Sequence, residues 1–581
     1  MDGSHEVGAN VPEAKRYDFS IAMMIAGALG SSASVIAIIS DSDDMRHMAA
    51  IIAERWQNAK VRLLSTPPVS AGLPGVVKTP VSSIDDVFNA IAAGPAPDII
   101  VDDAASRSFG EFGLFKRLFL ALNDGGRYVA LDADVEHLAA QAEGSNNSTQ
   151  HWLSELREPN TGITKDPWAS AVSKAIDESR SVGPHLVITK RGRHLTKINN
   201  LLHREGGESR VEGCVNRRSG QGAVERIASI PGHSWNANSD FETTDADYAA
   251  RYLKDSYSVR ELVAKVYRGP VVAPRQVITM DGLLLPESSM QPLVRPMTNR
   301  FITDAGPDFA WDPRLEEEPG MLSGTYFYLD NEYPGHYGHF TSQDLTKLWA
   351  WDDALRYDPN CKILISPPPQ KPDLNPYQYD LLRAFGISRD QVTLLSAPMR
   401  VEKLIVSTFA LQNPYFASPV CLEIWGKIRD RLMAEAARDL PKRVFIGRSR
   451  QLRRRCLNSD EVESVFRSHG FEIVYPENLG IADQIALFSQ AEAVAGYAGS
   501  GMFTMAYSQN HPTWIVIGSR SYTATTEYLL ANLHEDPIRY AMCDPEIEQP
   551  VSGWSSDAYF SNYSFNFERD GRQLESMLAR L

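Results

Sequence analysis

The sequence has few features that would place it outside a reducing compartment. Among 581 residues there are five cysteines, and no two of them form a CxxC pair. Their odd number and wide spacing argue against a disulfide framework and against a structural zinc site. The longest apolar runs fall well short of the roughly 20 residues that a transmembrane helix needs. The polar first 15 residues also lack the pattern of a signal peptide. We therefore expect a cytoplasmic protein.

The chain also lacks an excess of basic residues. It carries 58 Lys and Arg against 73 Asp and Glu, which gives a formal net charge of -15. Such a surface repels phosphate backbones, so nucleic acid is not an expected partner. A small basic cleft for a nucleotide diphosphate is still compatible with this balance.

Alternating strand and helix patterns predict an α/β fold with parallel sheets. Residues 1–17 are expected to be a mobile tail, and 18–205 a first Rossmann-like domain. The polar, glycine-rich stretch in 206–270 is expected to be a linker. Two further Rossmann-like lobes are expected over 271–415 and 416–581.

An arginine-rich segment follows a predicted strand that ends near residue 446. In open α/β sheets, ligands bind at the carboxyl ends of the strands, and guanidinium groups hold phosphate oxygens by paired hydrogen bonds. The segment therefore predicts a phosphate site, with an exposed basic loop as the alternative. Its polar residues are Arg448, Arg450, Arg453, Arg454, Arg455 and Asn458.

A glycine turn follows a second predicted strand. Gly499, Ser500 and Gly501 open a helix there, where backbone amides and the helix start favour a phosphate. The pattern is neither GxGxxG nor GxxxxGK[ST], so neither a dinucleotide site nor a P-loop follows. The alternative is a tight strand-to-helix turn without a ligand.

Three residues between these two segments join the candidate set. Pro476 and Glu477 follow a predicted strand on the same expected edge, and Gln484 lies in the next helix. The Glu477 carboxylate suits sugar or ribose hydroxyls, although an acid in a first helical turn also has a purely structural role.

In their order along the chain, these segments resemble glycosyltransferase family 61, which includes bacterial capsular-polysaccharide enzymes. The resemblance covers roughly residues 271–581. It implies a GT-B fold of two Rossmann-like lobes, inversion at the anomeric carbon and no obligatory metal. It rests on Phe445-Ile446-Gly447-Arg448, Arg454-Arg455, Asn458-Ser459-Asp460-Glu461, Gly470-Phe471, Pro476-Glu477, Gln484 and Gly499-Ser500-Gly501, with Gly338-His339-Phe340, Leu348-Trp349-Ala350-Trp351 and Arg400-Val401-Glu402-Lys403-Leu404 upstream.

The chain departs from the family pattern at two positions. Ala498 stands where many members have a histidine, and Gln343 where many have a carboxylate. Asp-x-Asp pairs, which could bridge a metal to diphosphate, occur at Asp41/Asp43, Asp132/Asp134 and Asp245/Asp247. None lies near the arginines in sequence, so no metal is expected.

A glycine-containing loop before residue 340 supplies candidates for the general base. An inverting transfer needs a group that takes the proton from the acceptor hydroxyl, and a histidine near its ordinary pKa suits this role. His339 is the first candidate, with His336, Glu332 and Asp344 as rivals. His336 and Tyr337 are also candidates for acceptor contacts. Helix packing or a phosphate contact is the alternative role of His339.

The first domain resembles the class I methyltransferases that use S-adenosylmethionine. The resemblance rests on Asp102-Asp103 at a strand end and on Gly125-Gly126 before the next strand. The family's glycine-rich turn is replaced here by the segment Ser40-Asp41-Ser42-Asp43-Asp44, whose side chains fill the cofactor's space. We therefore expect a degenerate domain for scaffolding, oligomerisation or acceptor binding, without S-adenosylmethionine.

The favoured prediction is an inverting, metal-independent glycosyltransferase without a required cofactor. It moves a sugar from a nucleotide-diphosphate sugar to a glycan acceptor, in capsule or cell-surface polysaccharide synthesis. The alternatives are a non-catalytic scaffold of a polysaccharide-assembly complex and a bifunctional methyltransferase–glycosyltransferase. Peripheral association with the inner membrane and homo-oligomerisation stay open.

Overall fold

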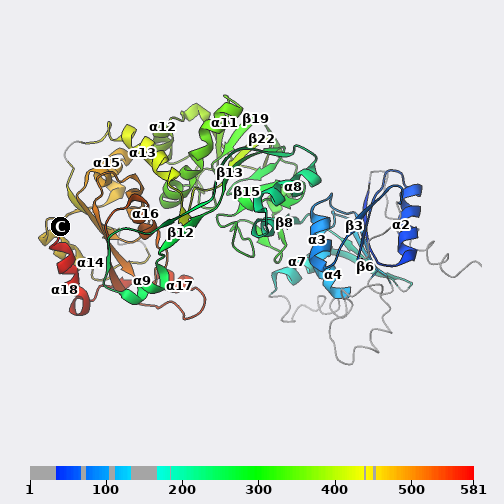
Figure 1. Cartoon of the computed structure of the whole chain (residues 1–581), viewed down its shortest axis with the longest axis horizontal. Coiled ribbons are helices and arrows are strands. Elements are labelled where there is room, and N and C mark those ends of the chain that lie inside the picture. Colours follow the sequence, from blue (N-terminus) through cyan, green and yellow to red (C-terminus); the bar gives the residue numbers. More distant parts are fainter. Residues whose placement is uncertain are drawn as a thin grey trace, which may run out of the picture. The chain divides into compact units, whose positions relative to one another are not determined.

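The computed structural model describes a mixed α/β protein with several sheets (Figure 1). The described residues are 34–66, 73–103, 111–131, 166–183, 185–437, 440–448 and 453–581. The expected tail 1–17, Asp132/Asp134 and the donor-site candidate Arg450 lie outside them. Two compact units share the chain: 1–224, 270–272 and 277–320 form the first, and 225–269, 273–276 and 321–581 form the second.

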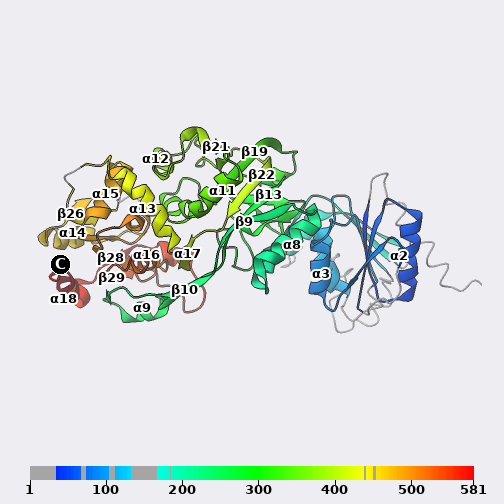
Figure 2. The same cartoon turned by 45° about the horizontal axis from the view of Figure 1, so that its top comes forward.

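The first unit contains a seven-stranded sheet in the order β3-β2-β1-β4-β5-β7-β6. The first five of these are parallel, and β6 and β7 close the edge as antiparallel strands. Figure 2 shows α2 (Asp43–Arg55) on one face and α3 (Ile84–Ala92) on the other. The strands are β1 (Val35–Ile39), β2 (Lys60–Ser65), β3 (Val76–Pro80), β4 (Ile99–Asp102), β5 (Arg127–Ala130), β6 (Ile176–Val182) and β7 (His185–Lys190).

Residues 206–270, expected to be a linker, form regular structure. Gly206 (φ 75°) and Gly220 (φ 106°) flank helix α8 (Gly207–Ser219), so these glycines end a helix rather than mark a loop. Further along, β11 (Phe241–Thr243) and the buried β13 (Leu262–Arg268) join sheets of the second unit. The polar composition here reflects edge strands and an exposed helix face.

The second unit carries a seven-stranded sheet with six parallel strands in the order β11-β29-β28-β27-β25-β26, and the short β30 (Tyr563–Ser564) pairs antiparallel with β29. Among β25, β26 and β27, β25 comes first along the chain, and in the sheet β26 lies on one side of it and β27 on the other. The strand order therefore reverses between β25 and β27. The strands are β25 (Arg443–Ile446), β26 (Glu472–Val474), β27 (Ala493–Tyr497), β28 (Thr513–Ser519) and β29 (Ile538–Pro545), joined by helices α14 (Ser459–Ser468), α15 (Ile481–Gln490) and α16 (Thr526–His534).

The other sheet of this unit precedes it in the chain. Strand β13 pairs antiparallel with β22 (Met399–Ser407), while β19 (Gly320–Tyr328), β20 (Lys362–Ile365) and β21 (Val392–Leu394) run parallel. Helices α11 (Trp351–Tyr357), α12 (Pro376–Phe385) and α13 (Val420–Leu432) accompany it. A short α10 (Tyr337–His339) and a π-helix (Phe340–Asp344) follow β19.

One buried apolar cluster joins the two sheets of the second unit. It runs from Phe327 and Trp351 through Trp425 on α13 to Trp514 on β28. The Trp425 ring is fully buried, and its Nε1 donates a hydrogen bond of 3.1 Å to the Thr341 carbonyl. Helix α13 packs against the helical segments that follow β19 and β27, so it holds these two segments together. Among the described residues, no helix is long and apolar enough to cross a bilayer.

Candidate functional site

The site begins where the strand order of the parallel sheet reverses. Helices that follow the two strands at such a point cover opposite faces, which leaves a crevice at the carboxyl ends. Ile446 at the end of β25 pairs with Gly496 near the end of β27. Arg448 and Gly499 therefore leave neighbouring strands at this crevice.

Two guanidinium groups pack against the glycine turn. Arg448 Nη1 donates to the Ala498 carbonyl at 3.4 Å, and Arg454 Nη2 donates to the same oxygen at 3.0 Å. Gly499 has φ 137°, and a Cβ there would lie 2.6 Å from Arg454 Nη2 and 2.9 Å from Arg448 Nη1. Only glycine fits this turn. The structure thus brings together two arginines and a turn that lie about 50 residues apart in sequence.

The backbone amides of the turn divide into two groups. The Gly499 amide donates to Glu527 Oε1 at 2.6 Å, so the protein itself occupies it. The Ser500 and Gly501 amides open the 3-10 helix Ser500–Tyr507 and make no hydrogen bond to the described part of the chain. Both residues are half-exposed, and amides at a helix start favour an anion.

The two arginines have different surroundings. The Arg454 guanidinium stacks on the Tyr522 ring at 3.7 Å from its centroid. The residue is 7% exposed, so it packs behind the turn and is shielded from solvent. Arg448 is half-buried, and its Nε has no hydrogen-bond partner among the described residues. Burial, and then the neighbouring Arg454, lower the pKa of Arg448. An anion would relieve both effects, since it supplies the missing partner and counter-charge.

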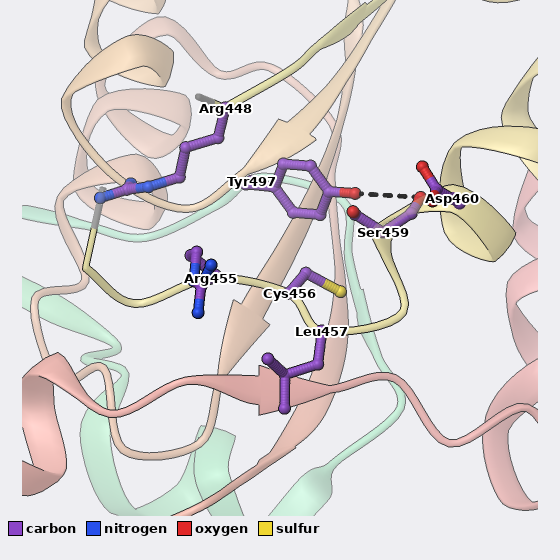
Figure 3. A pocket seen from close by; sticks show the side chains of 7 residues that line it. All are labelled: Arg448, Arg455, Cys456, Leu457, Ser459, Asp460 and Tyr497. Atoms are coloured by element: carbon purple, nitrogen blue, oxygen red, sulfur yellow. Dashed lines mark hydrogen bonds between the residues drawn. The ribbon is translucent and has the colours of Figure 1, made fainter. Parts of the chain in front are cut away.

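A pocket of about 200 Å³ opens beside Arg448. Figure 3 shows Arg448 and Arg455 on one side, Ser459 and Asp460 on the other, and the Tyr497 ring between them. The Tyr497 hydroxyl donates to the Ser459 carbonyl at 3.5 Å. Ligand sites for whole drug-sized molecules measure roughly 300–1,000 Å³, so this pocket has room for one part of a larger ligand. Cys456 and Leu457 complete its lining.

The remaining candidates of this half hold loops in place. Asn458 donates to the Phe565 carbonyl at 2.9 Å and accepts from the Phe565 amide at 3.0 Å. Gln484 Nε2 donates to the Pro476 carbonyl at 2.8 Å, which fixes the loop after β26. Glu477 in that loop is exposed. In this structure the side chains of Asn458 and Gln484 therefore form hydrogen bonds with the backbone of the protein.

Residues 330–339, called here the histidine loop, lie directly against the glycine turn. A Cβ at Gly338 would lie 2.7 Å from Ser500 Cβ and 3.0 Å from the Phe503 ring. The Tyr337 hydroxyl is 2.7 Å from Thr504 Oγ1, which is the third contact between the two segments. Burial raises the pKa of Tyr337 to about 12, so this phenol stays neutral. The segment that carries the predicted base therefore contacts the predicted phosphate turn through Tyr337 and Gly338.

The geometry around His339 sets its tautomer. Its Nδ1 lies 2.6 Å from Gln343 Oε1, and an amide oxygen only accepts hydrogen bonds. Nδ1 therefore carries the proton, and the lone pair is at Nε2, as a general base requires. The ring stacks on Tyr333 at 4.4 Å between centroids, and His336 accepts from the His339 amide at 3.3 Å.

The carboxylates of this loop differ in their roles. Asp330 is buried and accepts hydrogen bonds from the Arg275, Gln276 and Ser366 amides and from the Ser366 hydroxyl, so it ties the loop to its sheet. Burial raises the pKa of Asp344 to about 8, against the opposing effects of Lys347 and the Asn331 side chain. Asp344 is therefore largely protonated at neutral pH, which weakens it as a base. Glu332 is 7% exposed.

Sequence reasoning missed several residues of the site, among them Tyr497, Tyr522 and the buried Glu527. Glu527 lies 28 residues after Gly499, at the start of α16, and no motif marks it. Only the fold brings its carboxylate to the turn.

Comparison with known proteins confirms the family resemblance for part of the chain. Residues 337–516 match the family model described as Glycosyltransferase 61, which supports a glycosyltransferase. This match includes His339, the arginines and the glycine turn, whereas Glu332 and His336 precede it. No curated protein matches the chain.

Solved structures with matches to this chain include methyltransferases. The MycE methyltransferase from the mycinamycin biosynthetic pathway, in complex with Mg and SAH, is 16% identical at a TM-score of 0.23 and covers 31% of this chain. An O-methyltransferase family protein from Burkholderia thailandensis is 14% identical at 0.19, and a putative ribosomal RNA methyltransferase from Plasmodium falciparum 15% at 0.20. The matches cover 49%, 59% and 96% of those three chains, so this chain spans about half the length of the first.

Proposed function

We propose that the second unit is an inverting glycosyltransferase of GT-B arrangement that uses a nucleotide-diphosphate sugar. The observation that carries this proposal is the contact of Arg448 with the Gly499–Gly501 turn inside the family-matched region. The acceptor is a glycan hydroxyl, and capsule or cell-surface polysaccharide synthesis is the proposed setting.

The donor's diphosphate would lie against the Arg448 guanidinium and the Ser500 and Gly501 amides. Negative charge grows on the diphosphate as its bond to the anomeric carbon breaks. Donors aimed at developing charge each contribute roughly two to three orders of magnitude in rate. Because guanidinium and amide groups supply this positive charge, the proposal needs no metal ion.

On the acceptor side, His339 Nε2 would take the proton of the attacking hydroxyl. The acceptor oxygen bonds to the anomeric carbon from the face opposite the diphosphate, which leaves with the bonding electron pair. Gln343 holds the imidazole in the required tautomer, although its neutral amide stabilises the protonated ring less than a carboxylate would.

The first unit is proposed to lack S-adenosylmethionine binding. Ser40 donates to the Asp103 carboxylate, and Asp41 accepts from the Thr66 hydroxyl at 2.5 Å. These side chains bridge the strand ends where the methyltransferase resemblance implies an open glycine turn. The proposed role of this unit is scaffolding or acceptor binding.

Nucleotide release, measured over a panel of nucleotide-diphosphate sugars with glycan acceptors, tests the function. At least one donor should be turned over, and Arg448→Ala should slow release about 100- to 1,000-fold. Arg467→Ala on α14, whose guanidinium pairs with Glu463, is the matched control and should keep full rate.

Donor stabilisation without turnover would favour the second candidate, a non-catalytic scaffold. Gln343 in place of the family's carboxylate is the observation on its side. Full turnover by Arg448→Ala would refute the assignment of the diphosphate site.

A further inference from the structure

Glu527 is a buried carboxylate that the mechanism above does not use. It lies in the first turn of α16, is 1% exposed, and its Oε1 accepts the Gly499 amide hydrogen bond at 2.6 Å. Gly499 adopts φ 137° and ψ -171°, a conformation that L side chains rarely adopt. The carboxylate therefore anchors the residue of the turn whose backbone conformation favours glycine.

The surroundings of Glu527 make its charge sensitive to a ligand. Burial raises its pKa to about 7, while its own backbone amide, the Gly499 amide and then the two arginines oppose this rise. The other titratable groups that face it are tyrosines whose own pKa values are raised by burial, so they stay neutral. The charged and titratable neighbours are Arg448, Arg454, Tyr248 on α9 (Ala246–Tyr252), Tyr522 after β28, Tyr540 on β29 and Tyr559 on α17 (Ser556–Phe560).

The Glu527 carboxylate is a counter-charge for both arginines, which favour its charged form. A diphosphate at Arg448 brings two negative charges into the same low-dielectric crevice, where like charges repel strongly. The protein lowers this repulsion if Glu527 takes a proton from solvent. The amide hydrogen bond survives protonation, because a carboxyl group retains an acceptor oxygen.

We propose that Glu527 is a positioning residue that holds the Gly499 turn and takes up one proton when an anion binds at Arg448. The inference rests on the proposed donor site and adds a regulatory property, since anion affinity then falls as pH rises through neutrality. The proton moves from solvent to the carboxylate, and no bond to the donor forms or breaks.

Sulfate is a suitable probe, because its charge stays at -2 between pH 5 and 9. The melting temperature of the full chain is followed with increasing sodium sulfate at constant ionic strength. The response of Arg448→Ala is subtracted to remove general salt effects. Wild-type sulfate affinity should fall about tenfold between pH 6 and pH 8, as linkage requires for a group with a pKa of about 7.

Substitutions at Glu527 separate its charge from its hydrogen bond. Glu527→Gln keeps an acceptor for the Gly499 amide, so it should bind sulfate at both pH values with the affinity of the wild type at pH 6. Glu527→Ala should lose the sulfate response, because the turn loses its anchor. Glu492→Gln, which changes an exposed carboxylate paired with Lys442, should behave as wild type.

The outcomes separate this inference from the proposed function. Equal pH slopes in wild type and Glu527→Gln would overturn the role of Glu527 while leaving the anion site intact. A normal sulfate response in Glu527→Ala would overturn the anchoring role. A sulfate response in Arg448→Ala equal to that of wild type would instead refute the donor site itself.

Discussion

Replacing Gly499 by alanine should disable the site with a measurable cost in stability. The new Cβ would meet Arg454 Nη2 at 2.6 Å and Arg448 Nη1 at 2.9 Å, distances that force both guanidinium groups to move. The backbone at φ 137° adds strain of about 1–3 kcal/mol for a residue with a side chain. We therefore expect the free energy of unfolding to fall by about 2 kcal/mol.

The loss of transition-state stabilisation in Gly499→Ala should exceed the loss in free energy of unfolding. Displacing Arg448 removes one donor to the leaving diphosphate, so nucleotide release should slow about 100- to 1,000-fold. Urea unfolding and nucleotide release are measured on the same preparation. Gly480→Ala is the control, because its Cβ would meet only Asp483 Oδ2 at 3.9 Å. Full activity of Gly499→Ala would refute the close packing of the arginines on the turn.

Three further results should follow. Gln343→Glu should raise the pKa of His339 and move the acidic limb of kcat/KM upward by about one pH unit, whereas an unmoved limb argues against His339 as the base. Burial raises the pKa of Asp344 to about 8. The stability that this raised pKa contributes to the folded state is fully present below the pKa of the unfolded chain and is lost as the pH rises through about 8. The melting temperature of wild type should therefore fall more steeply from pH 6 to 9 than that of Asp344→Asn, and parallel curves would exclude this titration. Iodoacetamide should label Cys456 before the other cysteines, since it lines the pocket and is 8% exposed, and a bound nucleoside diphosphate should slow the labelling; first labelling elsewhere would contradict the pocket.

Local patterns predicted the parts of the fold that depend on short segments. The apolar run Val35–Ile39 forms β1, and the strands before Arg448 and Gly499 are β25 and β27. The prediction that Arg448 and Gly499 lie at the same edge of the sheet came from the rule that ligands bind at the carboxyl ends of parallel strands. Polar composition misled at 206–270, because helix caps and edge strands use the same glycines and charged residues as linkers.

Other features of the site depend on tertiary contacts that no short pattern encodes. Glu527 reaches the turn only because α16 follows β28, which pairs with β27. Asn458 and Gln484 matched the family pattern, yet the hydrogen bonds described here go to neighbouring loops. The raised pKa of Asp344 arises from burial, which sequence spacing does not reveal.

A structure of the full chain with a bound nucleoside diphosphate tests the central claim most directly. The phosphate oxygens should lie within hydrogen-bond distance of the Arg448 guanidinium and the Ser500 amide, with the histidine loop facing the terminal phosphate. A diphosphate bound away from the crevice between β25 and β27, with Arg448 still resting on the Ala498 carbonyl, would contradict it.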